Sequence, residues 1–431
     1  MLGGGTFTKQ NKILPGSYIN FVSTQSVNSN IGERGVVAIG LELDWGKDNE
    51  IIEVTAEQFN KEANKIFGYD YGHINLRGLR DLFKNAVKGY IYKLNNDGQK
   101  ASNSYATAKY TGKRGNDLKI VIEKNIDDEN KFDVITLLET SQIDKQTISE
   151  ASELIDNDYI TFKKDTALEV TAMAPLEGGT NGSVTGQNHQ DFLNKIESYN
   201  FNTLGCLSKE TEITTLYVTY TKRLREEQGV KFQTVVYNNQ ADYEGIVNLK
   251  NSTEEEETGL IYWVTGIIAS CNINTSNTNK IYNGEYTVNS EYTQTELENC
   301  IQNGEFVLHK VGNEIRVLVD NNSLTKITNE KGEEFKSNQT IRVLDQIATD
   351  IATTFNKRYL GKIQNNDSGR ISLWNDIVSL FKEYATLQAI ENFDSKEITV
   401  EQGNDKKSVV VNSSVQIINS MEKLYMSVVV S

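Results

Sequence analysis

Apolar positions along the first hundred residues follow the spacing of strands and then of helices. Residues 36–43 form a short apolar run, typical of a strand buried in a sheet. Thr55 and Gln58 then form a capping-box pattern, which predicts a helix that ends at Gly68. A second helical stripe covers 79–87, and an apolar strand is expected at 90–94. This order predicts a strand–helix–helix–strand layer.

The pattern changes after the turn sequence at 95–98, where short strands replace helices. Strands are expected at 105–110, 118–123, 132–139 and 159–163, separated by Gly, Asn and Asp. Between the last two, Thr147 with Glu150 predicts a short capped helix. We interpret residues 97–171 as a β-rich insertion domain, folded on itself and peripheral.

Helices and strands alternate again between residues 172 and 335. Helices are expected at 189–199, 211–227 and 259–270, and a further one capped by Thr293 and Glu296; strands are expected at 202–207, 231–237 and 245–249, with a hairpin of 306–310 and 314–319. The simplest arrangement joins residues 24–96 and 172–335 into one central α/β domain, which the insertion interrupts.

The last hundred residues predict a small α+β domain at 336–418. A regular helical stripe runs over 341–355, and a second helix, apolar almost all round, is expected at 371–390. Strands are expected at 397–401 and 408–411. Because a two-stranded ribbon is marginally stable by itself, this sheet has room for additional strands. The predicted fold class is therefore a multidomain α+β and α/β protein.

Both ends of the chain are apolar, whereas termini are usually polar and frayed. The N-terminal arm, residues 1–23, and the C-terminal arm, residues 419–431, are predicted to be extended and to pair as strands, either with the chain's own sheet or with a neighbouring subunit. The candidate inter-subunit residues are Phe7, Ile13, Leu14, Tyr18, Ile19 and Phe21 in the first arm and Leu424, Tyr425, Met426, Val428, Val429 and Val430 in the second.

Length and composition narrow the class of protein. A chain of 431 residues is too long for one hydrophobic core, and its net charge of −15 argues against a nucleic-acid partner. The longest apolar run, 259–270, is shorter than the roughly 20 residues that span a bilayer, so no membrane insertion is expected. The first ten residues do not resemble a secretory signal, which favours synthesis in the cytoplasm. Three widely spaced cysteines predict free thiols.

The motifs of common catalytic sites are missing from the sequence. No Gly-Lys pair is followed by the Ser or Thr of a phosphate-binding loop, and His73, His189 and His309 have no metal-site spacing. The glycine-rich segment 178–183 could cradle an anion, but a loop that needs positive φ is the favoured interpretation. We therefore expect no catalytic residues, no metal and no cofactor, although an active site assembled from distant residues stays an alternative.

Six segments, taken in order and spacing, resemble one protein family: PGSYINFVS, ERGVVAIGLELDWG, AKYTGKRGNDLKIVI, APLEGGTNG, TKRLREEQGVKFQTVV and MEKLYMSVVV. They resemble the contractile tail sheath proteins of bacteriophages and of phage-tail-like bacteriocins, particularly those of Gram-positive bacteria. The resemblance runs along most of the chain, and no single segment is a chemical signature.

The resemblance implies a structural protein without enzymatic activity. Such subunits stack as hexameric rings around an inner tail tube and contract to drive the tube through a target cell envelope. The implied partners are further copies of the chain, the inner tube protein, and baseplate and tail-terminator proteins. The two arms would add strands to the C-terminal domains of neighbours, the insertion would face outward, and helices 341–390 are candidates for the tube-facing side. Another self-assembling tube or surface-array protein is the main alternative.

Overall fold

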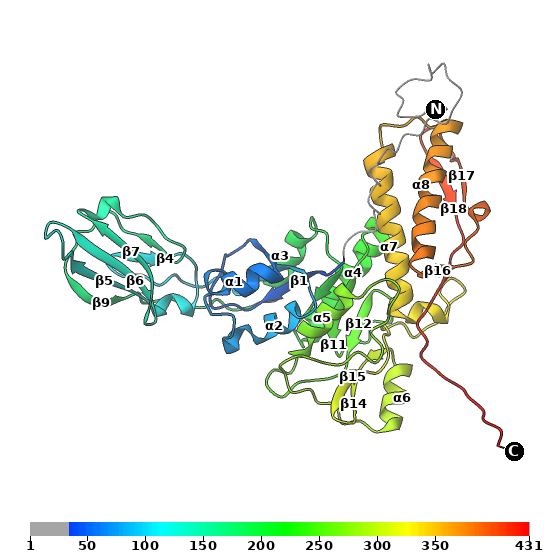
Figure 1. Ribbon diagram of the computed structural model, residues 1–431, viewed down its shortest axis with the longest axis horizontal. Coiled ribbons are helices and arrows are strands. Elements are labelled where there is room, and N and C mark those ends of the chain that lie inside the picture. The colour runs from blue at the N-terminus through cyan, green and yellow to red at the C-terminus, as the bar shows by residue number, and fades with distance from the viewer. Residues whose placement is uncertain (1–33, 431) are drawn as a thin grey trace, which may run out of the picture. The chain divides into compact units, whose positions relative to one another are not determined.

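The computed structural model describes residues 34–430, which separate into two compact units. One unit comprises residues 349–417, and the other contains the remaining described residues, including 418–430. Figure 1 colours the chain from its N-terminal to its C-terminal end. The candidate residues of the N-terminal arm, from Phe7 to Phe21, lie outside the described residues.

A seven-stranded sheet forms the centre of the larger unit. Its strands lie in the order β13-β12-β11-β10-β1-β3-β2, and every neighbouring pair is parallel except β2 with β3. Strands buried on both faces need apolar residues almost throughout, as in the all-apolar β1. The bounds are β1 Val36–Leu41, β2 Ile51–Thr55, β3 Lys88–Lys93, β10 Thr203–Gly205, β11 Gln233–Tyr237, β12 Ile246–Leu249 and β13 Glu305–Phe306.

Helices cover both faces of this sheet, so alternate residues of β1 enter different cores. Val37, Ile39 and Leu41 pack in one cluster with α1 and α2, whereas Ala38 packs in the opposite cluster with α3 and α4. Helix α5 lies on the first of these faces, against α2 and β10 (Figure 1). The bounds are α1 Ala56–Phe67, α2 Arg77–Phe83, α3 Gly186–Ile196, α4 Thr211–Arg223 and α5 Leu260–Ser270.

Two of the predicted capping boxes are confirmed. The Thr55 and Gln58 side chains form a reciprocal capping box, and Gly68 ends α1 in the left-handed conformation at φ 78°. Thr293 and Glu296 form the same box at the start of α6, Gln294–Gln302. The hairpin that follows consists of β14 Leu308–Val311 and β15 Glu314–Val317. Strand β2, which sequence analysis did not predict, continues directly into α1.

The β-rich region has its own hydrophobic core and two sheets. The first sheet has the order β7-β6-β5-β9, and the second pairs β4 with β8. The bounds are β4 Ala106–Ala108, β5 Leu118–Lys124, β6 Phe132–Leu138, β7 Ser141–Ile148, β8 Ile160–Phe162 and β9 Thr171–Pro175.

Two sequence expectations in this region need correction. Thr147 does not cap a helix, because it lies in β7 opposite Asp133 and its hydroxyl bonds that carboxylate at 2.6 Å. A single 3-10 turn, Ala151–Glu153, follows instead. Strand β9 pairs with β5, so this sheet continues beyond residue 171, where we expected the insertion to end. Tertiary pairing outweighs a local capping signal here.

The unit of residues 349–417 contains helix α8, Asp367–Thr386, and two short strand pairs. Strand β17, Thr399–Gln402, pairs with β18, Val409–Asn412, and β16, Ile390–Glu391, pairs with β19, Gln416–Ile417. Helix α7, Asn338–Thr354, leads into this unit. The expectation that the second helix is apolar almost all round is wrong: an exposed stripe runs along α8 through Ser368, Ile371, Asn375, Ser379 and Lys382.

Candidate assembly site

Residues 424–430 form an exposed, mostly apolar segment with no assigned secondary structure. Its side chains are almost fully accessible, from 71% for Val428 to 92% for Val429; the six predicted residues are Leu424, Tyr425, Met426, Val428, Val429 and Val430. Within the described chain no strand pairs with them. Burying an aliphatic or aromatic side chain contributes about 1.5–3 kcal/mol, so this segment gains most from a partner outside it.

The segment before this one is fixed to the larger unit. The Gln339 side-chain amide donates to the Ile418 carbonyl at 3.3 Å and accepts the Ser420 N–H at 3.0 Å. The Thr278 hydroxyl donates to the Glu422 carboxylate at 2.6 Å. The exposed C-terminal arm therefore begins immediately after Glu422.

The small unit presents short sheets with few strands. Strands β17 and β18 pair only with each other in the described chain, and Val410 and Val411 of β18 are exposed. The Trp374 indole on α8 donates to the Ile398 carbonyl at 2.9 Å and so attaches the start of the ribbon to the helix. Such a ribbon is marginally stable and offers open edges to an added strand.

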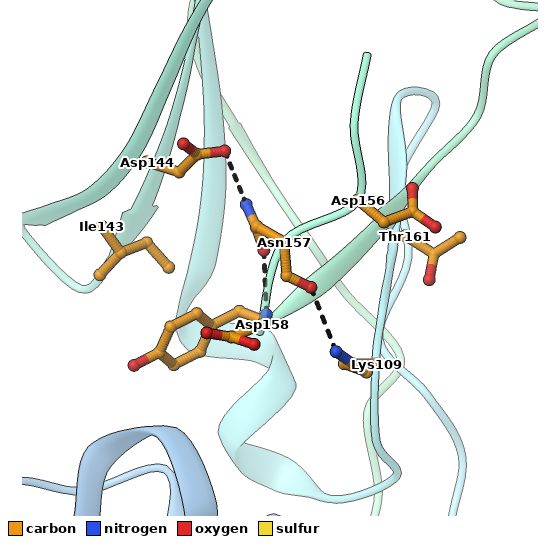
Figure 2. Close-up of a pocket in the computed structure, with 8 residues that line it drawn as sticks. Lys109, Ile143, Asp144, Asp156, Asn157, Asp158 and Thr161 are labelled. Atoms are coloured by element: carbon orange, nitrogen blue, oxygen red, sulfur yellow. Dashed lines mark hydrogen bonds between the residues drawn. The ribbon is translucent and has the colours of Figure 1, made fainter. Parts of the chain in front are cut away.

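The polar groups that line a hollow of about 490 Å³ in the β-rich region hydrogen-bond to other parts of the chain (Figure 2). The Asn157 side chain donates to Asp144 at 3.1 Å and accepts the Tyr159 N–H at 2.9 Å, while Lys109 donates to the Asn157 carbonyl at 3.4 Å. Asp158 pairs with Lys65 of α1 at 2.9 Å, which raises the pKa of that lysine. These bonds connect the insertion's loops to one another and to the central domain.

A second hollow, of about 370 Å³, lies at the carboxyl ends of β1 and β10, where α/β sheets often bind ligands. His189 lines it and is buried, with Nδ1 3.0 Å from the Tyr217 hydroxyl. Burial lowers the pKa of His189 to about 4, so its imidazole is neutral. His189 is therefore a buried packing residue with a hydrogen-bonded ring.

Among residues 34–430, no group of three or more His, Cys, Asp or Glu side chains is arranged to hold a metal ion. The three cysteines are free and buried, as predicted. No helix in the described part of the chain has the length and apolar character needed to cross a bilayer. The features that stand out are instead the exposed C-terminal arm and the small unit with open sheet edges.

A layered multidomain fold with an exposed apolar arm is typical of structural subunits that pair with a neighbour through an added strand. Four family models match consecutive parts of the chain: the tail sheath protein Gp18 domain III N-terminal region at 34–94, the phage tail sheath protein beta-sandwich domain at 96–181, the phage tail sheath protein central domain at 182–323 and the phage tail sheath C-terminal domain at 330–431. The chain belongs to the phage tail sheath protein family.

Relatives along the whole chain agree with this membership. The crystal structure of the sheath tail protein from Desulfitobacterium hafniense is 35% identical with a TM-score of 0.84, and the match covers 95% of this chain and 99% of that one. The phage-like element PBSX protein XkdK of Bacillus subtilis is 31% identical over 472 residues, covering both chains fully. The helical sheath of the anti-feeding prophage in its contracted state shares the fold, with 10% identity and a TM-score of 0.56 over 97% of this chain and 99% of that one.

Sequence analysis identified the exposed C-terminal residues but not the contacts that hold the arm. Thr278 and Gln339 were missed because neither belongs to a motif. Each contacts a segment that lies 79 or more positions away in the chain. Local pattern carries no signal for such pairs.

Proposed function

We propose that this chain is the subunit of a contractile tail sheath, which polymerises as stacked hexameric rings around an inner tube and contracts to drive the tube through a target cell envelope. Membership of the sheath family supports this function, and the fold shared with a contracted sheath is consistent with it. The observation that carries the proposal is the C-terminal arm, whose apolar side chains have no partner strand in the described chain.

The arms act as strands donated to neighbouring subunits. Residues 424–430 supply alternating side chains to an open edge in the 336–418 domain of another copy, and residues 7–21 do the same from the N-terminal arm. Main-chain hydrogen bonds give such a strand affinity, and the pockets for alternate side chains fix its register. Neighbours joined in this way stay connected while the domains between the arms change orientation.

Each domain then has its own position in the sheath. The central α/β domain forms the wall of the sheath, the β-rich insertion, which includes β9, faces outward, and helices 341–390 face the inner tube. Baseplate and tail-terminator proteins bind the ends of the polymer. The subunit is made and assembled in the bacterial cytoplasm and then becomes part of a phage tail or a phage-tail-like particle.

Electron microscopy of the purified chain tests this function. At high concentration the full chain is expected to form hollow tubes or stacked rings, and a chain that lacks residues 423–431 or 1–22 is expected to stay folded but unassembled. Ile126→Ser is the matched control, because Ile126 is 95% exposed in the β-rich region and lies outside both arms. Discrete monomers of the full chain at every concentration would contradict the proposed function. Tubes built from the truncated chains would contradict only the proposed role of the arms.

A further inference from the structure

The C-terminal arm leaves the larger unit from a short held segment, residues 418–422, which we call the arm root. One side chain, Gln339 in the first turn of α7, makes two hydrogen bonds to this root, with the Ile418 carbonyl and the Ser420 N–H. Gln339 is buried, so its amide is shielded from water that would compete for these bonds. Thr340 adds a bond from its hydroxyl to the Asn419 side chain at 3.2 Å.

The Thr278 hydroxyl holds the last residue of the root. It accepts the Asp320 N–H at 3.0 Å and donates its only proton to Glu422 at 2.6 Å. A hydroxyl has one hydrogen to donate, so the Asp320 bond leaves that hydrogen free for the Glu422 carboxylate. Beyond Glu422, no hydrogen bond within the described residues reaches 423–430.

Buried hydrogen bonds attach the loop that carries Thr278 to helix α7 and to Asp320. Arg342 of α7 donates to the Asn272 and Thr275 carbonyls at 3.2 and 3.0 Å, and to the Asp320 carboxylate at 3.0 Å. That carboxylate also accepts the Asn277 N–H at 3.0 Å. These buried hydrogen bonds fix the loop that carries Thr278.

Arg34, at the beginning of the described chain, contacts the same loop. Arg34 donates from Nε to the Cys271 carbonyl at 3.0 Å, immediately after the end of α5. A cation at a helix C-terminus is favourable, because it faces the unpaired carbonyls of the last turn. The chain that follows the N-terminal arm and the root of the C-terminal arm are therefore both attached to residues 271–278.

We propose that Thr278 and Gln339 are positioning residues that fix the arm root and so limit the donated strand to the residues after Glu422. This inference rests on the proposed function. An extended chain spans at most about 3.3–3.6 Å per residue, so residues 423–430 reach roughly 28 Å from Glu422. The acceptor sheet of a neighbouring subunit therefore lies within that distance in every state of the sheath. While the arm root stays bound, no further residues can be added to the length of the arm.

Spin labels on the full chain at a concentration below assembly test the root directly. Ser420→Cys and Leu424→Cys place one label on the root and one on the arm; the native cysteines are buried, and burial raises the pKa of Cys206 to about 12, which suppresses its labelling. The label at 420 is expected to rotate several-fold more slowly than the label at 424. Equal mobility at the two positions would overturn the inference.

Two substitutions then release the root without changing the arm. Thr278→Val with Gln339→Met keeps side-chain size and removes the polar groups, and it is expected to raise the mobility at 420 to that at 424. Thr275→Val is the matched control, since Thr275 lies in the same loop and its side chain does not contact the root. A released variant whose label at 420 stays slow would overturn the role of these two residues.

Assembly of the full chain and of the variants into tubes distinguishes a failure of this inference from a failure of the proposed function. If the full chain builds tubes, the released variant is expected to build tubes of irregular diameter at a several-fold higher critical concentration, and Thr275→Val to match the full chain. Regular tubes from the released variant would contradict the limit on arm length. If the full chain builds no tubes, the proposed function fails, while the label mobilities still report whether the root is fixed.

Discussion

Arg342 and Asp320 form an ion pair at 3.0 Å in which both side chains are almost completely inaccessible to solvent. Asp320 also accepts hydrogen bonds from Asn277 and Asn338, at 3.0 Å each. The buried Asp320 carboxylate is stabilised by these three donors together. Removal of one donor leaves a buried charge or polar group without a partner, which costs free energy of folding.

Arg342→Met is therefore expected to destabilise the larger unit strongly. Removing one member of a buried pair typically costs about 3–5 kcal/mol, since the partner charge stays buried. Urea denaturation followed by tryptophan fluorescence measures the change. Lys61→Met is the control, because the Lys61–Glu57 pair lies on the exposed face of α1 and such a pair contributes about 0.2–0.5 kcal/mol. Equal effects of the two substitutions would contradict the importance of the buried pair.

The central domain is expected to lose stability in mild acid because of His189. Its pKa falls from an ordinary 6.5 to about 4 on folding, so the unfolded chain binds a proton more readily. The stabilising contribution is present above pH 6.5 and is lost as the pH falls toward 4, on the order of 3 kcal/mol. Thermal unfolding across this range measures it. His189→Gln should flatten the pH profile, and a profile as steep as that of the unchanged chain would contradict the prediction.

The β-rich region is expected to weaken at lower pH. Hydrogen bonds from Thr147 and Asn125 and an ion pair with Lys145 hold the pKa of Asp133 at about 2. A carboxylate with a lowered pKa stabilises the fold above its unfolded value of about 3.9, and this contribution disappears as the pH falls toward 2. Amide exchange in β6 and β7 reports the loss. Asp133→Asn should remove this part of the pH dependence; an unchanged profile would contradict it.

Trp374→Phe is expected to loosen the ribbon of β17 and β18. The substitution keeps an aromatic ring on α8 but removes the indole N–H that bonds the Ile398 carbonyl. A single hydrogen bond of this kind contributes about 0.5–1.5 kcal/mol, and Ile398 immediately precedes β17. Faster hydrogen exchange at 399–412, with no change in β1, is the expected result. If exchange is unchanged in the ribbon, other contacts hold it to α8.

Local chemistry made several elements predictable. A capping box needs only residues three positions apart, so Thr55 with Gln58 and Thr293 with Glu296 marked the starts of α1 and α6 correctly. The apolar run at residue 36 likewise indicated a strand buried on both faces. Thr147 shows the limit of capping signals. Its hydroxyl donates to Asp133 on the neighbouring strand, and no helix begins there.

The sequence by itself determined the kinds of elements, the family resemblance and the apolar character of the C-terminal end, because these depend on residue type and short-range spacing. The tertiary structure decided the order of the central sheet, the pairing of β9 with β5, and the point at which the arm becomes free. Thr278 and Glu422 are 144 positions apart, and only the folded chain brings the hydroxyl to the carboxylate. Hydrogen bonds of this range leave no periodic trace in a sequence, since either partner alone is an ordinary polar residue.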